Sequence, residues 1–329
     1  MKTILRNSLA VLLISGCGGL GTQALLSASS APLNAASAGT FRAVAFQGHT
    51  YKLFVPSQAA SGAQLPLVLA LHGCSQDPDS FAAATQFNAV AEQQGFYVLY
   101  PEQTSDQNAL ECWNWFDPAD QQRGTGDPAL FVAEIQQVES QYRIDASRVY
   151  VAGFSAGGAM ANVMGATYPD VFAAVSANSG LEYQAATNAT AAWTAMTLGG
   201  PAAAEPARAA YQAMGPYRRV VPTIIFHGTA DYTVNELNAD EETEQWLKTD
   251  EMAGSGNLSR QSGEGTAHGG ASFTDTRYTD TRGQVIVEQV LVDDMGHAWS
   301  GGSASAQFTY PAGPAATERS WAFFSAHPM

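Results

Sequence analysis

Short apolar runs alternate with longer amphipathic stretches along most of the chain. The runs at residues 67–71, 96–100 and 149–152 are apolar throughout, which favours strands buried on both faces. Between them, residues 81–94 and 127–142 repeat apolar positions at helical spacing. Strands that alternate with helices predict βαβ units, and hence a mostly parallel sheet with helices on both faces.

Three segments depart from this alternation. Residues 40–46 and 51–55 switch between apolar and polar positions around a short turn, which predicts a β-hairpin. Residues 272–291 predict a strand pair. Residues 188–216 are rich in Ala, Gly and Pro and fit no single element, and a helical insertion is one interpretation.

Composition and charge narrow the class of protein. Of 329 residues, 46% are hydrophobic and 14% charged, which is typical of a folded protein with a sizeable core. The formal net charge of −15 predicts a surface that repels phosphate backbones and anionic lipids, so we expect no nucleic-acid partner. The oligomeric state stays open.

The N-terminal residues have the pattern of an export signal. Lys2 and Arg6 accompany a short apolar core at residues 9–14, which is too short for a spanning helix with these flanks. The tetrad that ends at Cys17 resembles a bacterial lipobox, whose cysteine is acylated and anchors the chain to a membrane. The alternative is a plain secretory signal that is cut within residues 24–38.

These patterns predict three parts and a secreted protein. Residues 1–17 would be the leader, residues 18–38 a flexible tether, and residues 39–329 one domain. With Cys17 in the leader, the other two cysteines, Cys74 and Cys112, form an even pair that an oxidising compartment would bridge. Two buried free thiols are the alternative.

A G-x-S-x-G motif at residues 153–157 is the strongest chemical signal. It follows the buried strand at residues 149–152 and opens a helical pattern over residues 156–168. That strand–turn–helix setting is typical of a nucleophile elbow, in which glycines permit a tight turn that exposes the serine hydroxyl. We therefore predict Ser155 as a nucleophile; the alternative is an ordinary strand-to-helix turn.

A serine nucleophile needs a base, which in this fold follows it in the chain. His297 lies in a loop just after an apolar strand, where such a base is expected, and we assign it that role. The rivals fit less well: His227 ends a strand, His268 lies in a glycine-rich loop, and His327 is near the C-terminus.

The orienting acid is predicted to be Asp231. It follows the strand at residues 223–227, and its carboxylate can accept the other ring N–H of His297 and fix the tautomer. Asp293 and Asp294 are too near His297 in sequence to face its ring, and we expect them to shape its loop.

Two backbone N–H groups are predicted to hold the oxyanion. One is that of Ala156, directly after the nucleophile, and the other is that of Cys74, in the loop after an early strand. His72 precedes Ser155, so we expect it to shape this loop rather than act as a base. No residues match the spacing of metal ligands or a phosphate loop, so we expect neither a metal nor a cofactor.

Five separated motifs follow one another along residues 40–325. They are His72-Gly73-Cys74-x-Gln76, Cys112-Trp113-Asn114-Trp115-Phe116, Gly153-Phe154-Ser155-Ala156-Gly157-Gly158, His227-Gly228-Thr229-x-Asp231 and Gly296-His297-x-Trp299-x-Gly301-Gly302. Together they resemble the poly(3-hydroxybutyrate) depolymerase family of esterases, which is close to the feruloyl and acetylxylan esterases. Their order is similar to that of extracellular depolymerases with a type 1 catalytic domain.

The resemblance implies an α/β-hydrolase catalytic domain with a Ser/His/Asp triad, an oxyanion loop at His-Gly-Cys, and a bridge between Cys74 and Cys112. It also implies hydrolysis through an acyl-enzyme on Ser155. Trp299 and Tyr183 are expected to contact substrate, unless they only pack under a loop, whereas Trp113 and Trp115 are expected in the core.

The expected function is therefore that of a carboxylic-ester hydrolase acting on short-chain polyhydroxyalkanoate or its oligomers. The alternatives are a feruloyl or acetylxylan esterase and, from another class, a non-catalytic binding protein on the same fold. Polymer-degrading members of the family usually carry a linker and a binding domain after the catalytic domain. This chain ends soon after residues 321–324, so we do not expect efficient attack on crystalline polymer.

Overall fold

The computed structural model describes residues 39–329, so the predicted leader, the tether and Cys17 lie outside the described residues. The central feature is a ten-stranded sheet. Its strands are β1 (Thr40–Phe46), β2 (His49–Val55), β3 (Leu65–Leu71), β4 (Tyr97–Pro101), β5 (Ile144–Phe154), β6 (Val175–Asn178), β7 (Thr223–Gly228), β8 (Ser259–Thr266), β9 (Ser272–Thr279) and β10 (Val285–Val292).

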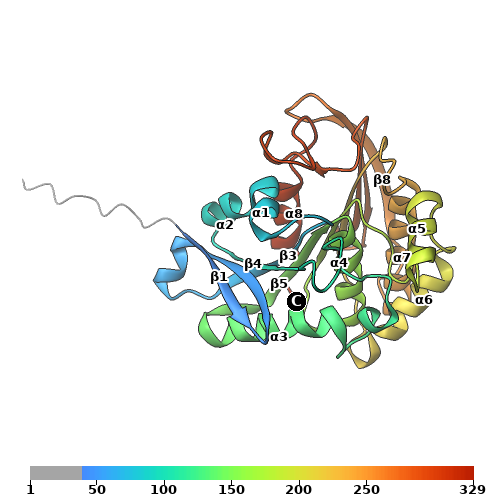
Figure 1. The fold of residues 1–329 in the computed structure, drawn as a ribbon. Coiled ribbons are helices and arrows are strands. Elements are labelled where there is room, and N and C mark those ends of the chain that lie inside the picture. The colour runs from blue at the N-terminus through green and yellow to red at the C-terminus, as the bar shows by residue number, and fades with distance from the viewer. Residues whose placement is uncertain (1–38) are drawn as a thin grey trace, which may run out of the picture. The chain divides into compact units, whose positions relative to one another are not determined.

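The strands lie in the order β1-β2-β4-β3-β5-β6-β7-β10-β9-β8. From β4 to β10 all neighbours are parallel, and antiparallel strands complete both edges. Helices cover both faces (Figure 1), which confirms the predicted architecture. They are α1 (Pro78–Thr85), α2 (Phe87–Gln94), α3 (Gly126–Gln141), α4 (Ala156–Thr167), α5 (Ala189–Leu198), α6 (Ala204–Ala213), α7 (Leu237–Ala253) and α8 (Ala316–Ser325).

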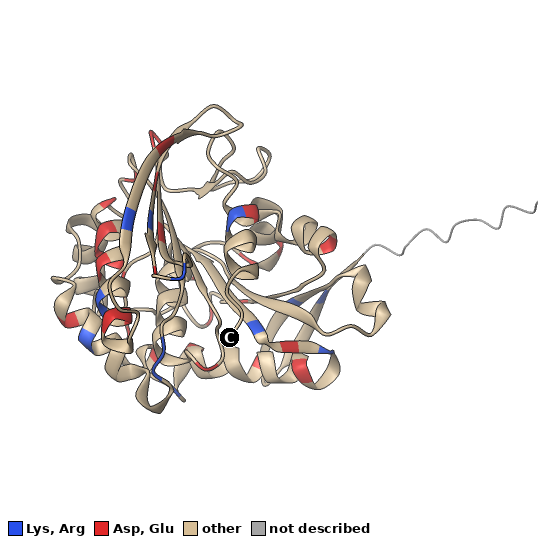
Figure 2. Cartoon of the chain, turned by 180° about the vertical axis from the view of Figure 1, so that it is seen from behind, with Lys and Arg blue, Asp and Glu red and all other residues tan. Residues whose placement is uncertain are grey.

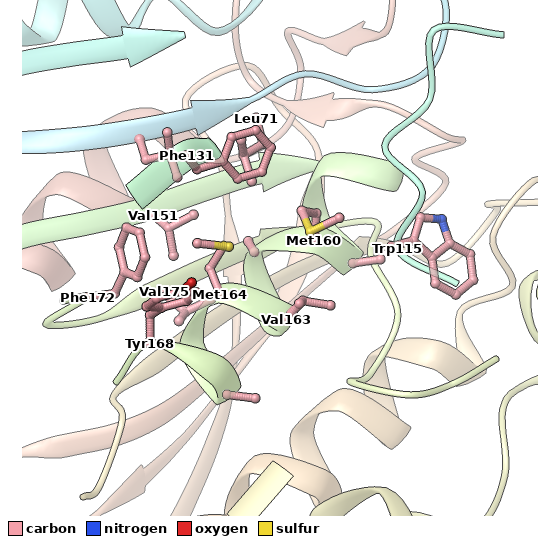
Figure 3. Packing of buried hydrophobic residues seen from close by; sticks show 14 of the residues in the cluster. Leu71, Trp115, Phe131, Val151, Met160, Val163, Met164, Tyr168, Phe172 and Val175 are labelled. Carbon is pink, nitrogen blue, oxygen red and sulfur yellow. The ribbon is translucent and has the colours of Figure 1, made fainter. Parts of the chain in front are cut away.

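Each face of the sheet carries its own hydrophobic core. Along β3, Leu69 and Leu71 point into the core shared with α3, α4 and α7, while Val68 and Ala70 point into the core shared with α1, α2 and α8. Because both faces are buried, every position of such a strand is apolar, which explains the continuous runs in the sequence. Figure 3 shows Met160 of α4 within the first core.

Two elements differ from the predictions. Residues 81–94 form two helices rather than one, because Gln86 takes a left-handed conformation with φ of 61° between α1 and α2. Asp77 caps α1 through Ser80, with Pro78 in the first turn, so α1 also begins earlier than predicted. The edge strand β8 was not predicted, because its side chains are largely exposed and it carries no apolar alternation.

Residues 188–216, which fit no single element by their sequence, contain two helices, α5 and α6, inserted between β6 and β7. The helical interpretation of this stretch is therefore confirmed. No helix within residues 39–329 is both long enough and apolar enough to cross a membrane. Acidic residues are distributed over helices and strands alike, as Figure 2 shows, in line with the net charge of −15.

Candidate active site

Ser155 occupies a strained turn between β5 and α4. Its φ of 55° lies in the left-handed region, which non-glycine residues rarely adopt. The neighbouring glycines are needed for close approach: a Cβ on Gly157 would lie 2.1 Å from the carbonyl oxygen of Leu71. A Cβ on Gly153 would lie 2.0 Å from the carbonyl oxygen of Gly157. The motif therefore permits a turn that places Ser155 at the carboxyl end of β5, beside the cavity.

Three side chains from different loops form one hydrogen-bonded chain. His297 Nε2 lies 2.8 Å from Ser155 Oγ, and His297 Nδ1 lies 2.7 Å from Asp231 Oδ2. An ionised carboxylate only accepts, so Nδ1–H donates to Asp231 and Nε2 is left to accept the serine proton. The loops follow β5, β7 and β10, whose carboxyl ends meet at one edge of the sheet.

The carboxylate of Asp231 is held by its own loop. Its Oδ1 accepts the backbone N–H groups of Thr233 and Val234, both at 2.9 Å. Burial alone would raise the pKa of Asp231, but the hydrogen bond and charge of His297 and the loop N–H group outweigh it and lower this pKa. Asp231 is thus an anion placed to stabilise a protonated His297.

His227 supports this loop from below. Its Nε2 donates to the carbonyl oxygen of Val234 at 2.9 Å and lies 3.6 Å from Asp231 Oδ2. Burial lowers the pKa of His227, so the ring is neutral. The sequence placed this histidine at a strand end, and its contact with the loop that carries Asp231 is visible only in the fold.

Two backbone N–H groups beside the cavity have no partner of their own. Within residues 39–329, neither the backbone N–H of Cys74 nor that of Ala156 has an acceptor, and both residues line the cavity at Ser155. A disulfide joins Cys74 to Cys112, which excludes the alternative of two free thiols. The arrangement offers two donors to an oxyanion.

His72 fixes the loop that carries Cys74. Its Nδ1 donates to the carbonyl of Gly73 at 2.7 Å, and its Nε2 accepts the N–H of Gln103 at 3.1 Å. Burial lowers the pKa of His72 to about 4. Both ring nitrogens are occupied, so His72 shapes the loop, as the sequence predicted, and is not available as a base.

A cavity of about 690 Å³ opens at Ser155 and His297. No Asp, Glu, Lys or Arg of the described residues lines it, and the few polar side chains besides the triad members include Asn108 and Thr233. The wall is therefore mostly apolar, and its larger side chains come from the loop after β4, from the loop after β6, from α5 and from the loop before β12 (Thr309–Tyr310). They are Leu110, Trp115, Phe116, Leu181, Trp193, Met196 and Phe308, and Phe154 at the end of β5 joins them.

The structure corrects both predicted substrate contacts, because neither side chain lines the cavity. Trp299, which begins β11 (Trp299–Ser300), is buried, and its ring packs edge-on against Phe81 and Phe87 with centroids 5.7 Å away. Tyr183 is also buried, and its hydroxyl donates to the carbonyl of Gln121 at 2.7 Å. Trp299 is two residues after His297 in the chain, but both side chains are buried in the core.

Two tryptophans expected in the core differ in their surroundings. Trp113 is buried, and its indole N–H donates to the carbonyl of His72 at 2.9 Å. Trp115 is also buried yet has an edge on the cavity.

Helix α5 contributes Trp193 and Met196 to the cavity, and neither residue was predicted from the sequence. Their helical spacing within an Ala-rich stretch was the signal that could have revealed them. Among residues 39–329, no group of three or more His, Cys, Asp or Glu is arranged to hold a metal ion.

A mostly parallel sheet with a nucleophile on a strand–turn–helix and partners on later loops defines an α/β-hydrolase. Among solved structures, an acetyl xylan esterase from Aspergillus awamori shares this fold with a TM-score of 0.70 and 21% identity, over 88% of this chain and 100% of that one.

A family model described as Esterase PHB depolymerase matches residues 49–268. Poly(3-hydroxyalkanoate) depolymerase C of Paucimonas lemoignei is 37% identical over 248 residues, which is 74% of this chain and 56% of the relative. Feruloyl esterase B of Neurospora crassa is 40% identical over 131 residues, 40% of this chain and 43% of the relative. The chain therefore belongs to the Esterase PHB depolymerase family, and it spans about half the length of these curated relatives.

Proposed function

We propose that the chain is a serine esterase that forms an acyl-enzyme on Ser155. The observation that carries this proposal is the hydrogen-bonded chain from Ser155 through His297 to Asp231, with distances of 2.8 and 2.7 Å, at the end of an apolar cavity. A serine hydroxyl is a weak nucleophile until a base accepts its proton, and this geometry supplies that base.

The reaction proceeds in two steps. As Ser155 Oγ attacks the ester carbonyl, its proton passes to His297 Nε2, and the resulting imidazolium is stabilised by Asp231. The carbonyl oxygen becomes an oxyanion that accepts the N–H groups of Cys74 and Ala156. His297 then protonates the departing alcohol, and in the second step it activates a water that releases the acid and restores the serine.

For the substrate, we propose short-chain hydroxyalkanoate polyester or its oligomers. The cavity wall offers apolar surface and few polar side chains, which suits ester units with alkyl groups. A sugar hydroxyl buried against such a wall would lose its hydrogen bonds to water without replacement, at a cost of about 1–3 kcal/mol. The wall therefore favours a polyester over the feruloyl and acetylxylan esters for which relatives of the chain are named.

We also propose that the protein is exported. This rests on the sequence of residues 1–17, with a lipid anchor at Cys17 as one variant and a plain secretory signal as the other. Labelled palmitate that enters the wild type and is absent from Cys17→Ser would support the anchor, whereas an unlabelled protein in the culture medium would support the plain signal.

The test is release of 3-hydroxybutyrate from amorphous poly(3-hydroxybutyrate), followed by chromatography. Ser155→Ala should lower the rate by several orders of magnitude. Ser140→Ala is the matched control, because Ser140 is exposed on α3 and should leave the rate unchanged. Labelling by a fluorophosphonate, lost in Ser155→Ala, checks the nucleophile separately and excludes a non-catalytic binding protein.

The outcomes separate the two parts of the proposal. Monomer from the wild type and none from Ser155→Ala would support both the catalytic role and the substrate. Cleavage of p-nitrophenyl butyrate without attack on the polymer would leave the serine esterase standing and overturn the polyester. A wild type that cleaves neither compound would overturn the proposed activity itself.

A further inference from the structure

Helix α5 contributes one wall of the cavity. Ala189, Ala192, Trp193 and Met196 all line it, and their spacing of three and four residues places them on one face of the helix. The two alanines leave space, whereas Trp193 and Met196 fill it. These two large side chains therefore determine the shape of this wall.

The C-terminal end of α5 is tied to the loop that holds the acid. The carbonyl of Met196 accepts the N–H of Asn235 at 2.7 Å. The buried side chain of Asn238 donates to the carbonyl of Ala195 at 3.1 Å. Asn235 lies in the same loop as Asp231, so these bonds fix the wall relative to the catalytic acid.

Trp193 contributes little to the packing of the protein itself. The residue is 69% exposed, although it lines the cavity. Within the described residues its ring has no aromatic partner, and its indole N–H has no acceptor. An aromatic ring with this exposure adds little burial energy to folding, but it offers a ligand an apolar face and one hydrogen-bond donor.

We propose that Trp193 is a specificity-determining residue that selects esters with an extended acyl part, at least two linked hydroxyalkanoate units long. The ring packs on the alkyl groups of the second unit, and the indole N–H donates to its ester carbonyl. A two-carbon acyl group fills only a small part of the cavity, so it is held at Ser155 without this contact. The inference rests on the proposed function and names its substrate class more closely.

The experiment measures kcat and KM for p-nitrophenyl acetate, p-nitrophenyl octanoate and the linear trimer of 3-hydroxybutyrate. The variants are Trp193→Ala, Trp193→Phe and Leu198→Ala. Leu198 is the matched control, because it is on the same helix and 74% exposed but does not line the cavity. Since Trp193 is exposed, we expect all three variants to keep the Tm of the wild type.

Trp193→Ala should raise KM for the trimer and the octanoate by about tenfold, because it removes the apolar contact. Its kcat/KM for the acetate should stay within about twofold of the wild type. Trp193→Phe should keep most of the affinity for the octanoate and lose part of that for the trimer, since it keeps a ring but not the N–H. Leu198→Ala should match the wild type throughout.

The assignment would be overturned if Trp193→Ala reduced kcat/KM for the acetate and the trimer equally, or if Leu198→Ala reduced it as much as Trp193→Ala does. Unchanged kcat and KM of Trp193→Ala on both long substrates would also overturn it. If the wild type cleaves the octanoate but not the trimer, the polyester proposal fails, and the pair of nitrophenyl esters then decides the role of Trp193. If Trp193→Ala lowers kcat/KM for the octanoate about tenfold more than for the acetate, the role of Trp193 for a long acyl chain is supported. If it changes kcat/KM for both esters equally, that role is refuted.

Discussion

Two buried carboxylates occupy equivalent places in this fold but differ in their hydrogen-bond partners. Asp231 follows β7, and Glu182 follows β6, its parallel neighbour in the sheet. The two residues are 3% and 1% exposed. Asp231 accepts hydrogen bonds from two backbone N–H groups and from the ring of His297. Within residues 39–329, neither carboxylate oxygen of Glu182 has a hydrogen-bond partner.

The pKa values move in opposite directions for this reason. Burial, together with the negative charges of the nearby Glu241 and Glu242, raises the pKa of Glu182 to about 9. For Asp231, burial also acts upward, but the donors around it are stronger and the pKa is lowered. Burial alone therefore does not set the charge of a carboxylate. The hydrogen-bond donors that surround it decide whether it is an anion.

The largest effect is expected from removing the charge at Asp231. Asp231→Asn should lower kcat on p-nitrophenyl butyrate by about four orders of magnitude, because the amide no longer fixes the tautomer of His297 or stabilises its protonated form. Glu182→Gln should leave kcat within about threefold. A similar reduction of kcat by both substitutions would contradict the different roles assigned to Asp231 and Glu182.

A smaller effect is expected from His227, which supports the loop of the acid. His227→Phe removes the hydrogen bond to the carbonyl of Val234 and should lower kcat by about tenfold to a hundredfold, because Asp231 is then less well positioned. His327→Phe is the matched control. This histidine is also buried, and its ring nitrogens lie 2.6 and 2.7 Å from the carbonyl oxygens of Phe323 and Val285, between α8 and β10.

Both histidine variants should lower the Tm, since each loses buried hydrogen bonds. Only His227→Phe should lower kcat when the two are assayed well below their melting temperatures. An unchanged kcat in His227→Phe would show that the backbone N–H groups alone hold Asp231.

The smallest effect concerns Glu182 and stability. Its folded pKa of about 9 exceeds the ordinary value of 4.5, so between these pH values the folded protein binds more protons than the unfolded chain. This contribution to the free energy of unfolding is complete below about pH 4.5 and is lost as the pH rises towards 9. Glu182→Gln does not titrate and should remove that loss.

Thermal unfolding measured from pH 5 to pH 9 checks this. Glu182→Gln should raise the Tm at pH 8.5 by about 5 °C, with a smaller increase at pH 5. Glu251→Gln, which changes an exposed carboxylate of α7, is the control and should follow the wild type. A constant difference across the pH range would mean that Glu182 is ionised in the folded protein.

Much of the fold and the proposed triad could be predicted because their signals are local. A strand buried on both faces must be apolar at every position, and a turn as tight as the one at Ser155 admits only glycine at residues 153 and 157. Chain order then assigns Asp231 and His297 to loops at the same sheet edge. The structure places these side chains within hydrogen-bond distance of one another.

The remaining features depend on contacts between distant residues, which only the tertiary structure decides. Trp299 is only two residues after His297 in the chain, yet its ring turns into the core because Phe81 and Phe87 pack against it. The cavity wall comes from α5, an insertion whose place depends on bonds to Asn235 and Asn238. The sequence by itself determined which residues have the chemistry of an esterase. Packing decided which surfaces line the cavity, because a side chain turns towards whichever distant neighbours bury it.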